Sequence, residues 1–217
     1  MPVEQLIPIP FLLDFSNIQV DTSIIYAISI LIAVTINAEG QAMMATTLGD
    51  IQKDSKLRFH FNPLFHLDIP GLLCFAVAGF GWPRYVPIET KKFKYPNTYL
   101  ILSRFAGPLA NLLLAGIAGS IIWIYRTIGV QDQVFTIVLS VNLMVFVFSF
   151  LPLPPLAGAS FFCPLLPKKR HPAFTLSVKI SPYMLLILFI ILKYNRIEML
   201  NNALYPIVRA FHTFIIS

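Results

Sequence analysis

The chain has 217 residues, of which 57% are hydrophobic and only 12% are charged; the charged share is about half that of a soluble domain. With a mean hydropathy of +0.74, this composition excludes an ordinary soluble globular protein, a disordered chain and a nucleic-acid-binding module. The formal charge of +6 in so apolar a chain indicates membrane topology rather than contact with nucleic acid.

Residues 1–21 and the segment after them predict an interfacial arm followed by a first membrane span. The arm contains Pro2, Pro8 and Pro10, and prolines at this density break a helix. Residues 22–38 are uncharged and rich in isoleucine, which favours a spanning helix. We expect this helix to continue to about Leu48 and to stop at the glycine that follows.

The next two segments predict non-spanning structure. In residues 50–66, hydrophobic side chains alternate with Arg58 and His60, which favours a short strand; a hairpin of two strands also fits the pattern. Residues 67–82 are apolar, but they are short and interrupted by glycine and proline. Because basic segments flank them on both sides, we expect a re-entrant segment that protein surrounds.

Residues 105–125 predict a full span, because they are uncharged and bracketed by Arg104 and Arg126. Small or polar residues recur at every fourth position along them and form a stripe suited to close helix packing in lipid. These are Gly107, Asn111, Ala115 and Gly119.

The C-terminal half predicts further membrane segments. Residues 133–167 carry no charge and are too long for one span, and a proline-rich break near residues 152–155 divides them. Residues 172–192 predict another span, and residues 198–217 either span or lie in the interface. The main basic clusters, at 53–58, 84–94 and 168–170, are assigned to the cytoplasm, which places the N-terminus outside.

The predicted fold is therefore an all-α membrane protein. We expect a polytopic bundle of about four to six membrane segments, with a re-entrant or short segment and small extended or β elements. The expected divisions are an interfacial arm (1–21), a membrane core (22–166), and a C-terminal membrane helix with an interfacial or spanning tail (167–217).

Four sequence blocks point to a family. The first is Asn-Ala-Glu-Gly-Gln-Ala at 37–42, followed by Leu-Gly-Asp at 48–50. The second runs from Phe61 to Gly71 and continues to Val-Pro at 86–87. The third is Ala-Gly-Pro-Leu-Ala-Asn at 106–111, and the fourth joins Val-Asn-Leu at 141–143 to Leu-Pro-Leu-Pro-Pro-Leu-Ala-Gly at 151–158. In this order and spacing they resemble the site-2 protease family of intramembrane zinc metalloproteases, in its minimal branch without a PDZ domain.

The resemblance implies a definite chemistry, from which this sequence departs. In the family, an HExxH motif supplies two zinc ligands and a general base, and an Asp from a later span supplies the third ligand. Here these positions are Asn37, Ala38, Gln41 and Ala157. Shifting the register by one residue puts Glu39 on the base position but alanines on both histidine positions. We therefore predict a pseudoprotease that binds no metal and uses no cofactor, and is not an enzyme.

The remaining polar residues leave alternatives open. Glu39 is an ionisable group at membrane depth and a functional candidate, or it reaches water at the cytoplasmic end of its helix. Asn37 and Gln41 are spaced to bond to each other or to a partner helix. Under the resemblance, Asn111 and Asn142 either hold an extended peptide or bond between helices of this protein.

His66 and Asp68 fit the framework of the resemblance and predict a structural His–Asp contact. A replacement metal site made with His60 is the alternative. The basic clusters at 91–94 and 168–170 act as topology determinants or bind anionic lipid head groups.

The predicted function is a non-catalytic membrane protein that serves as an accessory subunit or helix-binding factor of a larger complex. Its expected partners are transmembrane helices of other membrane proteins and lipids, with no nucleic acid, in the bacterial cytoplasmic membrane. The alternatives are a metalloprotease with an atypical metal site and a regulator that binds transmembrane substrates without cleaving them. A channel is a further alternative, which only Glu39 favours.

Overall fold

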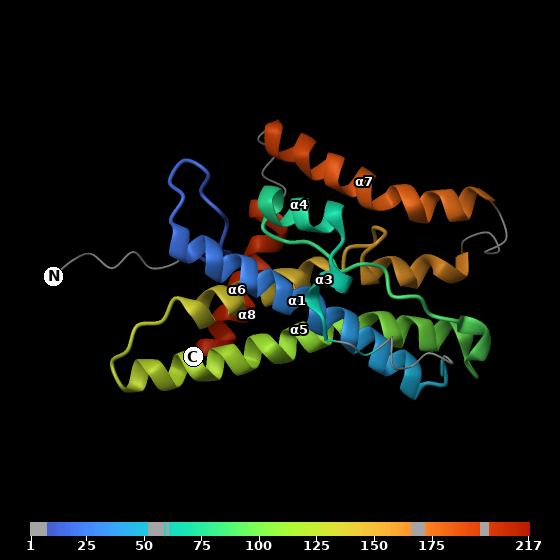
Figure 1. Ribbon diagram of the computed structural model, residues 1–217, viewed down its shortest axis with the longest axis horizontal. Helices are drawn as coiled ribbons and strands as arrows, with labels where there is room; N and C mark the ends of the chain where they lie inside the picture. Colours follow the sequence, from blue (N-terminus) through green and yellow to red (C-terminus); the bar gives the residue numbers. More distant parts are fainter. Residues whose placement is uncertain (1–7, 52–58, 60, 166–171, 196–199) are drawn as a thin grey trace.

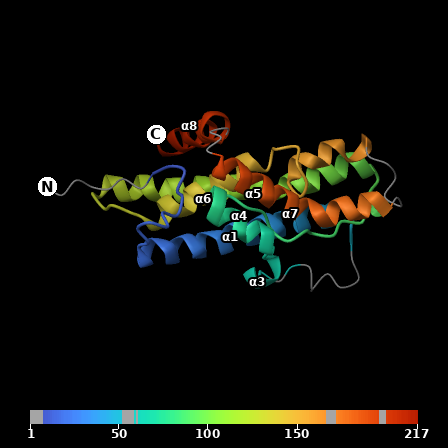
Figure 2. The same cartoon turned by 90° about the horizontal axis from the view of Figure 1, so that it is seen from above.

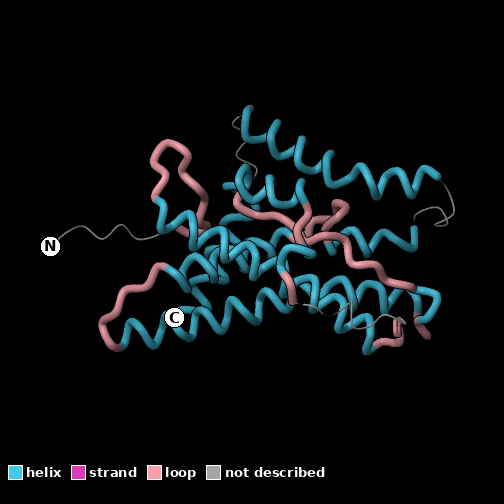
Figure 3. Tube along the Cα trace, viewed as in Figure 1, coloured by secondary structure: helices cyan, strands magenta, loops and turns pink. Residues whose placement is uncertain are grey.

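Helices form most of the molecule. A computed structural model describes residues 8–51, 59, 61–165, 172–195 and 200–217, and no strand occurs within these ranges (Figure 3). The α-helices are α1 (Val20–Thr47), α3 (Pro63–His66), α4 (Ile69–Ala78), α5 (Pro96–Thr127), α6 (Val134–Phe148), α7 (Pro172–Tyr194) and α8 (Tyr205–Ile216). Short 3-10 helices η1 (Thr90–Lys92) and η2 (Ala157–Leu165) and the π-helical turn η3 (Leu200–Leu204) complete the series.

The long helices α1 and α5 pack against each other and against α6, and these three helices form the centre of the molecule. The short helix α4 packs beneath α7 on one side of this centre (Figure 1). Helix α8 packs against α5 and α6 from another side, which is clearest in the turned view (Figure 2). Helix α6 is therefore enclosed on several sides, and every residue from 137 to 148 is buried.

Glycine allows α1 and α5 to approach closely. A Cβ atom added at Gly107 of α5 would lie 2.5 Å from Asn37 Oδ1 and 2.6 Å from the Asn37 carbonyl oxygen. On the facing helix, a Cβ added at Gly40 would lie 3.0 Å from both the Ala106 carbonyl oxygen and Ala110 Cβ. The predicted stripe of small residues is thus the surface of α5 that faces α1 at this level.

The expected end of the first helix is confirmed, and the span expected at 105–125 lies within a longer helix. Helix α1 ends at Thr47, and Gly49 follows with a φ of 111°, a conformation that favours glycine. Helix α5 begins at Pro96 rather than near residue 105, so Arg104 lies inside the helix, about 12 Å from its start at 1.5 Å per residue.

The expected number of membrane segments is not supported. Two described helices, α1 and α5, are long and apolar enough to cross a membrane. At 1.5 Å per residue they are about 42 and 48 Å long, more than the hydrocarbon thickness of about 30 Å. Helix α6 is apolar but has only 15 residues.

The expected small β elements are not supported either. The segment near 50–66 that favoured a strand falls mainly on residues 52–58 and 60, which lie outside the described residues. In the part of the chain that is described, the nearest feature to a sheet is one antiparallel bridge between Leu67 and Pro83. The described residues of this segment, 59 and 61–66 among them, form no ladder.

The segment expected to be re-entrant contains a short helix. Helix α4 has 10 residues, a length of about 15 Å, which cannot cross a hydrocarbon core of about 30 Å. Asp68 caps its start by accepting a hydrogen bond from Gly71 N at 3.2 Å, and Gly79 ends it with a φ of 74°. Beyond it, Phe80 stacks on Phe148 of α6 with ring centroids 3.7 Å apart, which fixes the extended segment that follows.

Candidate functional site

The four blocks that carry the family resemblance meet at one cavity. Asn37 and Gln41 reach it from the same face of α1, because they are one helical turn apart. Ala157 reaches it from the start of η2, where the chain turns after a cis Pro154–Pro155 peptide bond. The cavity measures about 20 Å³, room for about one water-sized group. The other lining residues are Trp82, Pro83, Arg84, Tyr85, Val86, Arg104, Pro108, Ser149, Pro155 and Leu156.

A chain of buried side-chain hydrogen bonds crosses the core from this cavity. Arg104 Nη1 donates to Gln41 Oε1 at 2.8 Å, and Gln41 Nε2 donates to Asn37 Oδ1 at 2.8 Å. Asn37 Nδ2 then donates to Asn111 Oδ1 at 2.6 Å. Asn111 Nδ2 donates to Asn142 Oδ1 at 2.8 Å and to the Ala33 carbonyl at 2.9 Å, and Asn142 donates to the Val138 carbonyl. The chain therefore links α1, α5 and α6.

All bonds in this chain run in one direction. Each carboxamide turns its oxygen toward Arg104 and its NH₂ group away from it. Aligned amide dipoles of this kind place negative partial charge next to the guanidinium, and hydrogen bonds in a chain polarise one another. This arrangement offsets part of the cost of burying a charged group within an apolar scaffold.

Arg104 is the site residue that the sequence did not reveal. It is only 9% exposed, and its guanidinium carbon lies 4.2 Å from the centroid of the Tyr85 ring, within cation–π range. The sequence placed Arg104 at the boundary of a span. The available signal was its spacing from Asn111, because seven residues bring two side chains to the same helix face after two turns.

Glu39 lies on the other side of α1, about 200° around the helix from Asn37. Its Oε1 atom lies 3.1 Å from His66 Nε2 and accepts a hydrogen bond from Phe61 N at 3.1 Å. Both Glu39 and His66 are buried. The carboxylate thus joins α1 to the turn at Phe61 and to α3, and it does not line the cavity.

His66 and Asp68, for which a mutual contact was expected, have partners that the sequence did not predict. His66 pairs with Glu39, as described above. Asp68 Oδ2 accepts hydrogen bonds from Gly71 N and, at 2.7 Å, from Trp82 Nε1. Asp68 therefore positions Trp82, which lines the cavity. The alternative metal site with His60 falls partly outside the described residues.

The side chains at the cavity do not fit a zinc ion. Zinc in proteins binds imidazole, thiolate and carboxylate groups, whereas Asn37, Gln41 and Ala157 bring two carboxamides and a methyl group to the cavity, with a guanidinium bonded to one carboxamide. Ala38, which the resemblance aligns with the general base, is fully buried in an apolar cluster with Val86. Nowhere in the described ranges do three His, Cys, Asp or Glu residues gather as a metal site would require.

Comparison with known proteins gives one informative relative. The chain is 32% identical over 172 residues to "Putative zinc metalloprotease YwhC" of Bacillus subtilis (strain 168). The alignment covers 75% of this chain and 78% of the relative. The chain belongs to the site-2-protease-like family. No protein-family model matches it, and no solved structure matches it.

The family assignment corrects one prediction. From Asn37, Ala38, Gln41 and Ala157 we expected that the chain is not an enzyme. That prediction is contradicted, because a relative covering three quarters of the chain is named a zinc metalloprotease, which points to protease activity. The expectation of a membrane protein of metalloprotease type agrees with this relative and with the two apolar helices of spanning length.

Proposed function

We propose that this M50-like membrane protein binds transmembrane segments of other membrane proteins over the mouth of the cavity that Asn37, Gln41 and Ala157 line. The observation that carries the proposal is the convergence of all four family blocks on this cavity. Burying polar groups inside an apolar helical scaffold costs free energy, so such groups mark functional sites by default. Such a site serves a polypeptide that brings its own polar backbone groups into an apolar environment.

The outer surface of the helices supports insertion in a bilayer. Large apolar side chains on α5 are strongly exposed, among them Leu113 at 70% and Ile117 at 59%. Helix α7 exposes Met184 and Ile187 in the same way. A soluble protein rarely leaves this much apolar surface open to water. We include in the proposal that the protein is multi-pass, lies in the bacterial cytoplasmic membrane, and works with lipids and partner helices in a larger complex.

The mouth of the cavity supports access for a partner. Tyr85 and Arg84 line it and are exposed, while Asn37 and Gln41 at its inner end are buried. The segment from Trp82 to Val86 is not helical, and the bond from Arg84 N to the His66 carbonyl oxygen, at 2.7 Å, holds it beside the mouth. A bound segment would therefore contact the aromatic and cationic groups at the mouth, because the interior has room for about one water-sized group.

Site-specific cross-linking tests the proposal in native membranes. A photoreactive amino acid at Tyr85 is expected to capture a defined membrane protein, whereas the same group at Trp123, an exposed position near the far end of α5, is expected to capture lipid. Ala157→Leu, which fills the cavity, should abolish the Tyr85 adduct and leave the Trp123 adduct unchanged. If the Tyr85 adduct persists in a folded Ala157→Leu protein, the partner does not bind in this cavity.

Peptide-bond hydrolysis is the second candidate function, favoured by the name of the relative. Because the cavity residues do not fit zinc, no hydrolytic step is assigned to a metal. The buried Glu39–His66 pair carries groups capable of proton transfer. Cleavage of a membrane-embedded peptide by the purified protein, measured by mass spectrometry and lost in Glu39→Gln, would support hydrolysis at this pair. Absence of cleavage at any added metal would reject this candidate.

A further inference from the structure

We infer that the surface formed by Lys91, Lys94 and Tyr95, at the end of the molecule where α5 begins, binds the anionic head groups of phospholipids. This inference rests on the membrane insertion included in the proposed function and deepens it, because it names the class of lipid and the residues that select it. The partner is a phospholipid whose head group has a net negative charge, such as phosphatidylglycerol.

The position of this surface along α5 places it at the level of lipid head groups. Tyr95, at the start of α5, and Trp123, near its end, are 54% and 55% exposed. At 1.5 Å per residue they lie about 42 Å apart along the helix axis, which matches the total thickness of a bilayer, about 40–45 Å. Exposed tyrosine and tryptophan side chains gather at both membrane interfaces. Lys91 and Lys94, just before Tyr95, therefore lie in or beside the head-group layer.

Two lysine charges of this surface are not neutralised by a described carboxylate. Glu89 is paired with Lys92 at 2.8 Å, and the same ammonium group lies 3.7 Å from Asp50. Lys91 and Lys94 are exposed, and neither forms an ion pair with any residue that the structure describes. Their charges are therefore available to an anion from outside the protein, and a lysine at the membrane surface attracts anionic lipid.

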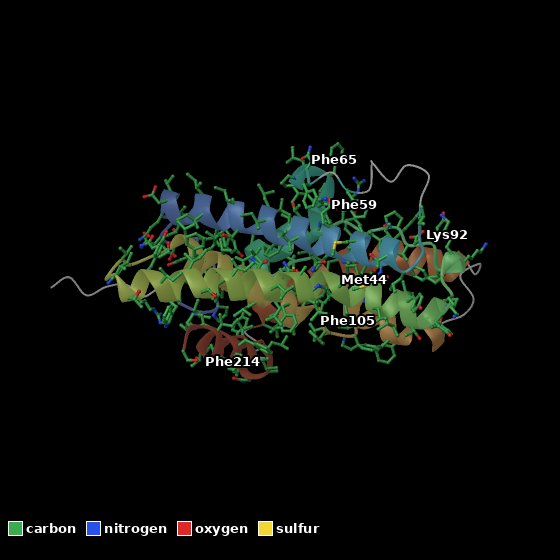
Figure 4. All side chains as sticks on the ribbon, turned by 90° about the horizontal axis from the view of Figure 1, so that it is seen from below. Met44, Phe59, Phe65, Lys92, Phe105 and Phe214 are labelled. Atoms are coloured by element: carbon green, nitrogen blue, oxygen red, sulfur yellow. The ribbon has the colours of Figure 1, made fainter. Side chains whose placement is uncertain are left out.

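Contacts with the end of α1 hold the backbone of this surface in place. Glu89 N donates to Oδ2 of the completely buried Asp50 at 3.1 Å, and Lys92 Nζ donates to the Ile51 carbonyl oxygen at 2.9 Å. Lys92 thus reaches toward the chain that follows α1, at the end of the molecule where Figure 4 labels it. Lys91 precedes it in the 3-10 turn η1, where successive side chains are about 120° apart. Lys91 therefore points away from the contact with α1.

Tyr95 holds the second lysine beside an interfacial ring. Lys94 Nζ lies 5.5 Å from the centroid of the Tyr95 ring, within cation–π range. The same ring packs edge-on against Tyr99, with centroids 5.5 Å apart. A tyrosine ring has an apolar body and a polar tip, which suits the boundary between acyl chains and head groups. Lys94 is therefore placed next to the side chain that marks this boundary.

Local quenching of a tryptophan by brominated lipid tests this inference. Leu102 is 47% exposed and lies two helical turns from Tyr95 on the same face of α5. The full-length protein with Leu102→Trp and Trp123→Phe is placed in vesicles of phosphatidylglycerol and phosphatidylcholine, with bromine on the acyl chains of one lipid at a time. The protein with Trp123→Phe alone supplies the background emission of the buried Trp82. We expect phosphatidylglycerol to bind about threefold more strongly than phosphatidylcholine at this reporter.

Matched variants assign the preference to the lysines. Lys91→Gln together with Lys94→Gln changes only exposed side chains, so the protein should fold normally, and the two lipids should then bind about equally at the Leu102→Trp reporter. Arg126→Gln removes an exposed arginine at the other end of α5 and should leave the preference unchanged. The native Trp123 reports lipid at that other end, and its quenching should not respond to the double lysine variant.

The outcomes separate this inference from the proposed function. If both lipids quench the Leu102→Trp reporter equally in the protein with its lysines, the inference is overturned and the proposed function stands. A preference that survives Lys91→Gln with Lys94→Gln would show that the head groups bind elsewhere, and it would also overturn the inference. If inorganic phosphate removes the preference and sodium chloride of equal ionic strength does not, the surface takes free phosphate rather than lipid. Quenching by neither lipid would contradict the membrane insertion on which both proposals rest.

Discussion

At the scale of single residues, the core depends on amide side chains that act as links between helices. Asn111 makes several of these links. It bonds to Asn37, Asn142 and the Ala33 carbonyl, and therefore contacts both neighbouring helices. It is completely buried. Loss of such a residue leaves the polar groups of its partners without a bond in an apolar environment, which costs more than the bond itself contributes.

Asn111→Leu is expected to destabilise the protein by about 2–4 kcal/mol, since three hydrogen bonds disappear and two buried amides lose a partner. The free energy of unfolding can be measured by titration with sodium dodecyl sulfate in mixed micelles. Leu113→Ala is the control on the same helix, because Leu113 is 70% exposed and should change stability by less than about 0.5 kcal/mol. Equal effects of the two substitutions would show that the amide chain does not stabilise the core.

The donor set at the cavity predicts how zinc affinity responds to mutation. Asn37→His, Gln41→His and Ala157→Asp together place two imidazoles one turn apart and a carboxylate opposite them, the ligand types that zinc prefers. We expect this triple variant to bind zinc at least about tenfold more tightly than the unmodified protein. Calorimetry with zinc chloride measures the affinity directly. The double variant Asn37→Ala with Gln41→Ala is the control, and stoichiometric zinc in the unmodified protein would contradict our account of the site.

At the scale of helices, the sequence predicted the contacts that follow from residue spacing along one helix. It missed the contacts in which side chains from several helices stabilise a buried charge. The stripe through Gly107 and Asn111 follows from a four-residue spacing, and it does face α1. Arg104 was interpreted as the end of a span, because a cation beside an apolar run usually marks the interface. The chain of amides that stabilises the buried Arg104 comes from three helices. No pattern within one segment of the sequence therefore predicts that Arg104 is buried.

Two further sequence interpretations depended on short-range spacing alone. The alternation of aromatic and basic residues favoured a strand, and most of that segment lies outside the described residues. His66 and Asp68 are two residues apart, which suggested a mutual contact, and the structure shows His66 paired with Glu39 from α1 and Asp68 bonded to Trp82. These partners come from other segments of the chain. Where short-range spacing allows several contacts for a side chain, tertiary packing decides which contact forms.

Two glycines of α5 provide a matched test of the α1–α5 contact. Gly107→Ala places a methyl group 2.5 Å from Asn37 Oδ1, so the helices must separate and the hydrogen bonds of Asn37 must lengthen. We expect a loss of about 1–3 kcal/mol of stability. Gly116→Ala has no neighbouring atom within 4 Å and should be neutral or stabilising by up to about 1 kcal/mol, because alanine favours helix. Unfolding titrations of both variants measure the difference, and a Gly107→Ala protein as stable as Gly116→Ala would disprove the close contact.

At the scale of the whole molecule, the apolar surface is distributed around the helices rather than gathered on one patch. Phe65 on α3 and Phe214 on α8 project from opposite sides of the α1–α5 pair (Figure 4), and they are 59% and 79% exposed. Strongly exposed apolar residues also occur on α5 and α7. Because a docking site for one partner would cover a single face, a surface of this kind is better matched by a bilayer that surrounds the molecule.

The two tryptophans of the chain test this environment directly. Trp123, on α5, is 55% exposed, whereas Trp82, beside the cavity, is 3% exposed. In vesicles of lipids with brominated acyl chains, which quench fluorescence on contact, the Trp82→Phe protein reports Trp123 alone and the Trp123→Phe protein reports Trp82 alone. We expect strong quenching of Trp123 and little quenching of Trp82, because protein side chains separate Trp82 from lipid. Equal and weak quenching of both would mean that α5 does not contact the hydrocarbon layer, and the proposed membrane insertion would then be wrong.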